Sequence, residues 1–162
     1  MSVEQEARPK TTSRARTLTV SEVVQETKDS ITISFEVPDE IVDDFKHQPG
    51  QFITLKIPSD QTGHVARCYS LSSSPHVDDF RLEIGVKRTD GGYASNWLCD
   101  NISVGMQVTA LPPSGQFTAK NLDVDMLFFA GGSGITPVLS LVKSALVSGG
   151  GEVVLFYANR DA

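Results

Sequence analysis

The sequence predicts two kinds of fold in one chain: a small antiparallel β-barrel, followed by the start of a parallel, doubly wound α/β domain. Two observations carry this prediction. Six short strand-like segments separated by turn residues occupy the first ~115 residues, as is typical of small barrels. After Phe117 the pattern changes to two apolar runs that flank a segment of helical periodicity, which indicates a βαβ unit.

The barrel strands are predicted from apolar runs, several of which alternate apolar and polar residues as half-buried strands do. They cover residues 18–24, 31–37, 52–57, 65–71, 80–86 and 106–111. Pro38 ends the second strand, and Pro112-Pro113 are expected to close the sixth. A short helix over residues 95–99, with Ser95 at or near its N-cap, precedes the sixth strand.

The α/β part begins with the continuous apolar run of residues 126–130, which is expected of a strand buried on both faces. A helix then follows over residues 135–147 and is stopped by Gly149-Gly150-Gly151. Residues 153–157 form the second buried strand. One βαβ unit can neither bury its sheet on both faces nor complete a nucleotide pocket, so we expect this chain to be a fragment of a longer protein.

The expected division of the chain has three parts. These are a flexible tail over residues 1–16, a barrel over residues 17–119, and a truncated nucleotide-binding domain over residues 120–162.

Composition excludes several classes of function. A net charge of −6 over 162 residues disfavours nucleic acid and anionic membrane surfaces as partners. No apolar run approaches the roughly 20 residues that span a bilayer, and the N-terminus lacks the apolar core of a signal peptide, so we expect a cytoplasmic protein. Cys68 and Cys99 show no CxxC spacing, so reduced thiols and no metal site are expected.

The first candidate site is Arg67-Cys68-Tyr69-Ser70 on the fourth predicted strand. An arginine can bind a diphosphate through paired hydrogen bonds, and a tyrosine can stack on a flat ring. The hydroxyl of Ser70 can approach a reactive ring nitrogen. An edge arginine beside a half-buried tyrosine is the alternative interpretation of the same residues.

The second candidate is the glycine turn of residues 91–95, which precedes the predicted short helix. Backbone N–H groups at such a helix start favour an anion. The alternative is a hairpin turn with an ordinary N-cap. For Lys87 and Arg88, just upstream, a solvated strand end is the simpler interpretation, and guidance of a phosphate is the alternative.

The third candidate is the glycine-rich loop of residues 131–137, which lies between a buried strand and a helix, as a dinucleotide loop does. Pro137 takes the place of the last glycine of GxGxxG and suits the first turn of a helix. Beyond the second strand, Asp161 is positioned to bind a ribose and Arg160 a 2′-phosphate. A solvated loop is the alternative for this last segment.

Taken together, these motifs resemble the ferredoxin–NADP reductase superfamily. RCYS resembles its flavin signature, GGYASNWL its FAD diphosphate loop, GGSGITP its nicotinamide-cofactor loop, and PGQF at residues 49–52 is also typical. The resemblance implies a barrel that binds FAD and a second domain that binds NADH or NADPH.

The resemblance also implies roles for individual residues. Ser70 and Thr136 would be catalytic, with Ser70 near the flavin nitrogen that accepts the hydride. The residues implied in cofactor binding are Arg67, Tyr69, Ser70, Val86, Lys87, Gly92, Tyr93, Ala94, Ser95, Gly132, Gly134, Thr136, Pro137, Asn159 and Arg160.

The activity implied by the resemblance is hydride transfer from the nicotinamide cofactor to FAD. Electrons would then pass singly to a [2Fe–2S] centre, expected only beyond this chain, and on to a Rieske-type oxygenase. The segments TGHVARCYSLSSSP, VKRTDGGYASNWLCD and LFYANRD are most similar to reductases that serve a 3-ketosteroid 9α-hydroxylase. The alternatives are a reductase for phenylacetyl-CoA oxygenation, a flavohaemoglobin-type reductase, or a flavin-binding fragment without activity.

Overall fold

The computed structural model describes residues 14–78 and 81–159. Most of the predicted tail, together with Arg160 and Asp161, lies outside the described residues.

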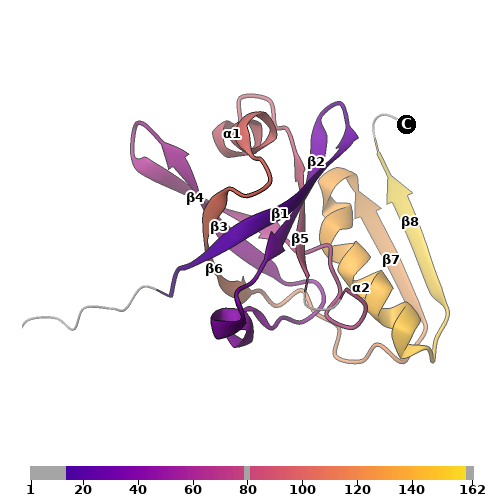
Figure 1. The fold of residues 1–162 in the computed structure, drawn as a ribbon. Coiled ribbons are helices and arrows are strands. Elements are labelled where there is room, and N and C mark those ends of the chain that lie inside the picture. Colours follow the sequence, from indigo (N-terminus) through magenta and orange to yellow (C-terminus); the bar gives the residue numbers. More distant parts are fainter. Residues whose placement is uncertain (1–13, 79–80, 160–162) are drawn as a thin grey trace, which may run out of the picture.

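Six antiparallel strands form the barrel (Figure 1), which confirms the fold class that the sequence predicts. They are β1 (Arg16–Thr27), β2 (Ser30–Glu36), β3 (Phe52–Ser59), β4 (Gly63–Ser70), β5 (Leu82–Lys87) and β6 (Gln107–Ser114). The sheet runs in the order β4-β3-β6-β1-β2-β5. An isolated bridge between Leu71 and Ile84 joins its two outer strands, so the sheet closes on itself.

The barrel core follows from the alternation of each strand. Ile53, Leu55 and Ile57 of β3 are fully buried, and Leu82 and Ile84 of β5 face them from the other side of the core. The intervening residues of β5 therefore point outward, toward the α/β part of the chain. A 3₁₀ helix η1 (Asp39–Phe45) between β2 and β3 was not predicted, and it buries Phe45.

Two boundaries differ from the sequence prediction. Pro112 and Pro113 lie within β6 rather than beyond its end, because they occupy a bulge where β6 has more residues than β3 between two paired positions. A bulge tolerates residues that have no N–H to donate. Helix α1 (Tyr93–Asn101) begins earlier than predicted, with Gly92 at the N-cap and Ser95 inside the first turn.

The α/β part is the predicted βαβ unit. It consists of β7 (Met126–Gly131), the 3₁₀ turn η2 (Gly132–Gly134), α2 (Ile135–Ser148) and β8 (Val153–Ala158), with β7 and β8 parallel. Helix α2 packs on one side against the barrel and on the other against β7 and β8 (Figure 1). It ends at Gly149, whose φ of 80° is the left-handed conformation that glycine favours.

The apolar sequences of β7 and β8 are those of strands buried on both faces, but one face of their sheet is open, as expected of a single βαβ unit. Phe129 and Phe156 are 71% and 57% exposed, and their rings stack with centroids 5.3 Å apart. Only α2 covers this sheet among the described residues, and it covers one face, so the other face remains open. Separately, no described helix has both the length and the apolar character needed to cross a bilayer.

Candidate functional site

The three sequence motifs meet in one cavity of about 580 Å³ between the barrel and the start of α2. This volume is within the range of small-molecule sites. Strand β4, strand β5, the turn before α1 and the loop before α2 all contribute to its wall. The lining residues include Arg67, Cys68, Tyr69, Ser70, Gly85, Lys87, Thr89, Gly91, Gly92, Tyr93, Ala94, Ser95, Ser133 and Thr136.

Strand β4 brings an exposed cation and a half-buried ring to this cavity. The Arg67 guanidinium donates a hydrogen bond to Ala66 O at 2.8 Å, and no carboxylate of the described residues forms an ion pair with it. Burial raises the pKa of Tyr69 to about 12 against the opposing effect of Arg67. Tyr69 is therefore a neutral phenol at physiological pH, and Ser70 follows it at the cavity wall.

The N-terminus of α1 forms the second part of the wall. No side chain caps this helix, and its first turn contains no acidic residue, so its first amides remain available to an anion. Ser95 Oγ accepts a hydrogen bond from Thr89 N at 3.2 Å, which leaves the hydroxyl proton of Ser95 to donate. A Cβ added at Gly92 would lie 2.8 Å from Thr89 Cβ, so the tight turn requires glycine.

Some predicted binding residues can contribute only through their backbone. The side chains of Val86 and Ala94 are 1% and 4% exposed and belong to the barrel core.

The side chains of two other predicted binding residues have partners within the protein. The Tyr93 hydroxyl donates to Pro58 O at 2.7 Å, which directs its ring toward β3. Lys87 forms an ion pair with Asp29 at 3.5 Å.

The loop before α2 forms the third part of the wall. Thr136 is 7% exposed, and its hydroxyl donates to Ser133 O at 3.0 Å. Gly132 has a φ of 51°, and its carbonyl accepts a hydrogen bond from the Tyr157 hydroxyl at 3.2 Å. Gly134 is the N-cap of α2, which has no side-chain cap and no acidic residue in its first turn; Pro137 lies in that turn.

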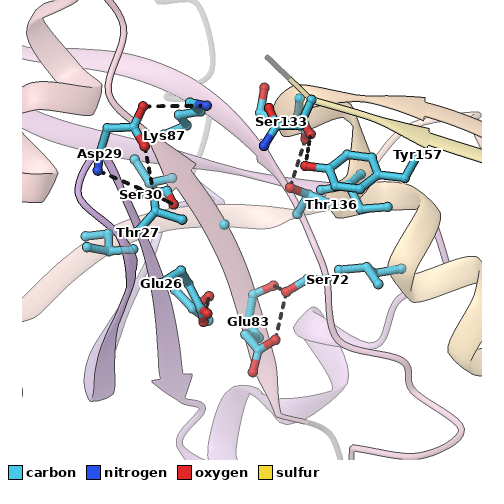
Figure 2. Close-up of a pocket in the computed structure, with 18 of the residues that line it drawn as sticks. Glu26, Thr27, Asp29, Ser30, Ser72, Glu83, Lys87, Ser133, Thr136 and Tyr157 are labelled. Carbon is cyan, nitrogen blue, oxygen red and sulfur yellow. Dashed lines mark hydrogen bonds and ion pairs between the residues drawn. The ribbon is translucent and has the colours of Figure 1, made fainter. Parts of the chain in front are cut away.

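A second cavity, of about 640 Å³, lies against the other side of the same loop. Figure 2 shows Ser133, Thr136 and Tyr157 on one side of it and the β1–β2 hairpin, with Asp29 and Ser30, on the other. Asn159 also lines it, at the carboxyl end of β8, where open α/β sheets bind ligands. The two cavities share Gly85, Lys87, Ser133 and Thr136 as lining residues.

Sequence reasoning missed most residues of this second cavity, among them Ser72, Glu83 and Gly85. Ser72 donates a hydrogen bond to Glu83 Oε1 at 2.8 Å, and Gly85 lies further along the same strand. The alternation of residues 80–86 could have revealed Glu83 and Gly85, because they must face outward if Leu82 and Ile84 face the core.

The barrel and its cavity define a flavin-type oxidoreductase domain. The chain belongs to the oxidoreductase FAD-binding domain family, whose model matches residues 17–119. It is 62% identical over 149 residues to the ferredoxin reductase component of 3-ketosteroid-9-alpha-monooxygenase from Rhodococcus rhodochrous, covering 92% of this chain and 42% of that protein. The chain thus spans about two fifths of the length of this relative.

Two further comparisons agree with this assignment. One component of the 1,2-phenylacetyl-CoA epoxidase from Escherichia coli is 33% identical over 149 residues, which cover 90% of this chain and 41% of that protein. The solved structure of phthalate dioxygenase reductase, described as transferring electrons from pyridine nucleotides to [2Fe–2S], matches with a TM-score of 0.78 and 25% identity. That match covers 91% of this chain and 44% of that structure.

The donors of the first cavity fit FAD. A diphosphate needs a cation and N–H donors, which Arg67 and the uncapped start of α1 supply. A flat ring system needs a neutral stacking surface, which Tyr69 supplies.

Proposed function

We propose that the protein is the flavin part of an NADH-dependent electron-transfer reductase. The observation that carries this proposal is the wall shared by the two cavities, which consists of Gly85, Lys87, Ser133 and Thr136. Two cofactors held in adjoining cavities approach each other only at such a wall. When bound, FAD accepts a hydride from the nicotinamide cofactor and releases the electrons singly.

The first cavity would hold FAD, with the diphosphate between Arg67 and the amides of Tyr93, Ala94 and Ser95. Tyr69 would cover the ring system and exclude water from one of its faces. Ser70, next along β4, would donate a hydrogen bond at the ring edge. Supporting this arrangement, the strand β4 and the start of α1 face the same cavity.

The second cavity would hold the nicotinamide cofactor. Gly132 and Gly134 leave room for a phosphate at the uncapped start of α2, and Asn159 would bind the ribose side. Thr136 would act where the two cofactors meet, because it lines both cavities. Catalysis by these residues amounts to alignment of two rings, since the cofactors supply the chemistry.

The partners follow from the relatives. The 62% identity to a 3-ketosteroid-9-alpha-monooxygenase component supports a Rieske-type oxygenase of steroid metabolism as the final acceptor, reached through a [2Fe–2S] centre outside this chain. The 33% identity to the phenylacetyl-CoA epoxidase component makes that system the weaker alternative. We place the protein in the reducing cytoplasm, because Cys68 and Cys99 are both free thiols.

The visible absorption spectrum of the purified protein, recorded anaerobically before and after NADH, tests this proposal. We expect flavin bands that bleach faster on addition of NADH than those of free FAD. Flavin bands that bleach no faster than those of free FAD would support the proposed FAD site and contradict the proposed nicotinamide site. A protein that remains colourless after incubation with FAD would reject both.

A further inference from the structure

A chain of buried serine hydroxyls connects α2 to the barrel. Ser73 and Ser74, in the loop between β4 and β5, and Ser140 and Ser144 of α2 are all 0% exposed. Buried hydroxyls in folded proteins are nearly always hydrogen-bonded, and each of these four has a partner. The contact between the two parts of the molecule is therefore directional as well as apolar.

The donors and acceptors of this chain can be assigned. Ser144 Oγ donates to Ser140 O at 2.7 Å, which uses its only proton. In the 2.7 Å contact between Ser74 Oγ and Ser144 Oγ, Ser74 must therefore be the donor. Ser74 Oγ in turn accepts the His76 amide at 3.1 Å. The direction of each hydrogen bond from the loop to the helix is thus assigned.

A second connection runs in parallel through Ser73. Its carbonyl accepts a hydrogen bond from Ser140 Oγ at 2.5 Å, and its hydroxyl accepts one from Glu83 N at 3.1 Å. Strand β5 is thereby linked to α2 through a single residue. At the surface, Lys143 pairs with Asp78 at 3.1 Å, and Asp78 also accepts the Ser74 amide at 2.7 Å.

These connections lie beside the wall shared by the two cavities. Thr136, Ser140 and Ser144 are spaced four residues apart, so they occupy one face of α2. Gly85 lies two residues beyond Glu83 on the same outward face of β5. Gly85 itself lies close to Thr136, since a Cβ added at Gly85 would be 3.1 Å from Thr136 Oγ1. The link from Glu83 through Ser73 to Ser140 therefore lies about one helical turn from this contact.

We propose that Ser140 and Ser144 are positioning residues that set the separation between Thr136 and β5, and so align the two cofactors. This inference rests on the proposed function for its catalytic consequence. Neither serine lines either cavity, so each acts through α2 rather than by touching a cofactor. Misplacement of reacting groups by ~1 Å costs about 100-fold in rate.

The test compares the FAD-loaded protein with its Ser140→Ala and Ser144→Ala variants. Ser148→Ala is the matched control, because Ser148 is an exposed serine at the end of the same helix. Stopped-flow absorbance gives the limiting rate of flavin reduction at saturating NADH, and FAD affinity and thermal stability are measured in parallel. We expect a limiting rate lower by at least about 10-fold in the two buried variants, with FAD affinity within about 2-fold of the parent.

Hydrogen exchange gives a readout that needs no NADH. The amides of α2 should exchange faster in both buried variants, and those of the barrel strands should not change. If the parent is reduced by NADH, a limiting rate within about 2-fold of the parent in the buried variants overturns the inference, even where stability falls. If the parent is not reduced, the proposed function fails, and unchanged exchange in α2 then overturns the positioning role.

If Ser140→Ala fails to fold, a more conservative variant replaces it in the test. Ser140→Cys keeps the size of the side chain and a weak donor, so it should fold and show a limiting rate between those of the parent and the alanine variant. A rate equal to that of the parent, together with parental exchange in α2, would count against the proposal.

Discussion

Thr136 lies directly against the backbone of Gly85. A Cβ added at Gly85 would come within 3.1 Å of Thr136 Oγ1 and 3.7 Å of Thr136 Cγ2. The absence of a side chain on β5 at this point is what lets the start of α2 approach the barrel. The two cavities consequently meet at a contact between Gly85 and Thr136, and one added methyl group would change the distance between these two residues.

Gly85→Ala should therefore separate activity from stability. The added methyl group displaces Thr136 by a few tenths of an ångström, while replacing a strand glycine recovers about 0.5–1 kcal/mol of backbone entropy. We expect a melting temperature close to that of the parent and a lower limiting rate of flavin reduction by NADH. An unchanged rate would mean that the Gly85–Thr136 contact does not control cofactor alignment.

Arg67→Ala should weaken FAD binding. A hydrogen bond to a charged group contributes about 1.5–3 kcal/mol, which corresponds to roughly 10- to 150-fold in affinity. Fluorescence titration of the apoprotein with FAD measures this change. Arg81→Ala is the matched control, because Arg81 is exposed, lies outside both cavities and pairs with Glu22. Equal flavin content in the two purified variants would exclude Arg67 from diphosphate binding.

Ser70→Ala should slow flavin reduction while FAD remains bound. The hydroxyl would contribute a hydrogen bond at the ring edge rather than anchor the cofactor, so we expect about a 10- to 100-fold loss of rate. Stopped-flow absorbance at saturating NADH makes the measurement. Parental rates in this variant would assign Ser70 to the wall of the cavity and not to the reaction.

Acidification should lower the free energy of unfolding because of His47. Burial lowers the pKa of its imidazole, against the raising effects of the carbonyls of Phe45 and Ser73 and of the Asp78 carboxylate. Its Nε2 atom is buried and has no hydrogen-bond partner among the described residues. Below about pH 6.5 the unfolded chain binds a proton that the folded chain resists. The stability contribution is thus complete above that pH and declines below it.

Urea unfolding at several pH values between about 7.5 and 5.5 checks this dependence. His47→Gln, which cannot titrate, should show a shallower loss of stability on acidification than the parent. If the free energy of unfolding declines equally with falling pH in the two proteins, His47 does not control the loss of stability in acid.

Much of the fold could be predicted because its signals are local. Alternation located the strands of the barrel, and helical spacing located α2. The two glycine motifs lie at neighbouring cavities, Gly91 and Gly92 at the first and Gly132 at the second. Each of these features depends on periodicity or on turn chemistry that a single segment carries.

The remainder depends on contacts between distant segments. Ser72, Ser73 and Ser74 look like an ordinary polar loop in the sequence. Only the packing of β5 and α2 against this loop makes them buried hydrogen-bonding groups, with Ser72 bonded to Glu83 and the other two bonded to α2. The Pro112-Pro113 pair resembles a strand end, and only pairing with β3 shows a bulge. The apolar run of β7 likewise indicates burial, but no described segment covers the open face of its sheet.

The closure of the barrel has a consequence for cofactor retention. The isolated bridge between Leu71 and Ile84 and the adjoining hydrogen bond from Ser72 N to Glu83 O at 2.8 Å join the ends of β4 and β5 in the described chain, so the two strands meet along a short seam. The first cavity lies across that seam and is lined from both strands. A ligand bound there replaces the missing cross-strand contacts, and at 100 times its dissociation constant it adds about 2.7 kcal/mol to the folded state. If the flavin binds there as proposed, its release and the opening of the barrel are expected to be coupled, so that the apoprotein opens first along this seam.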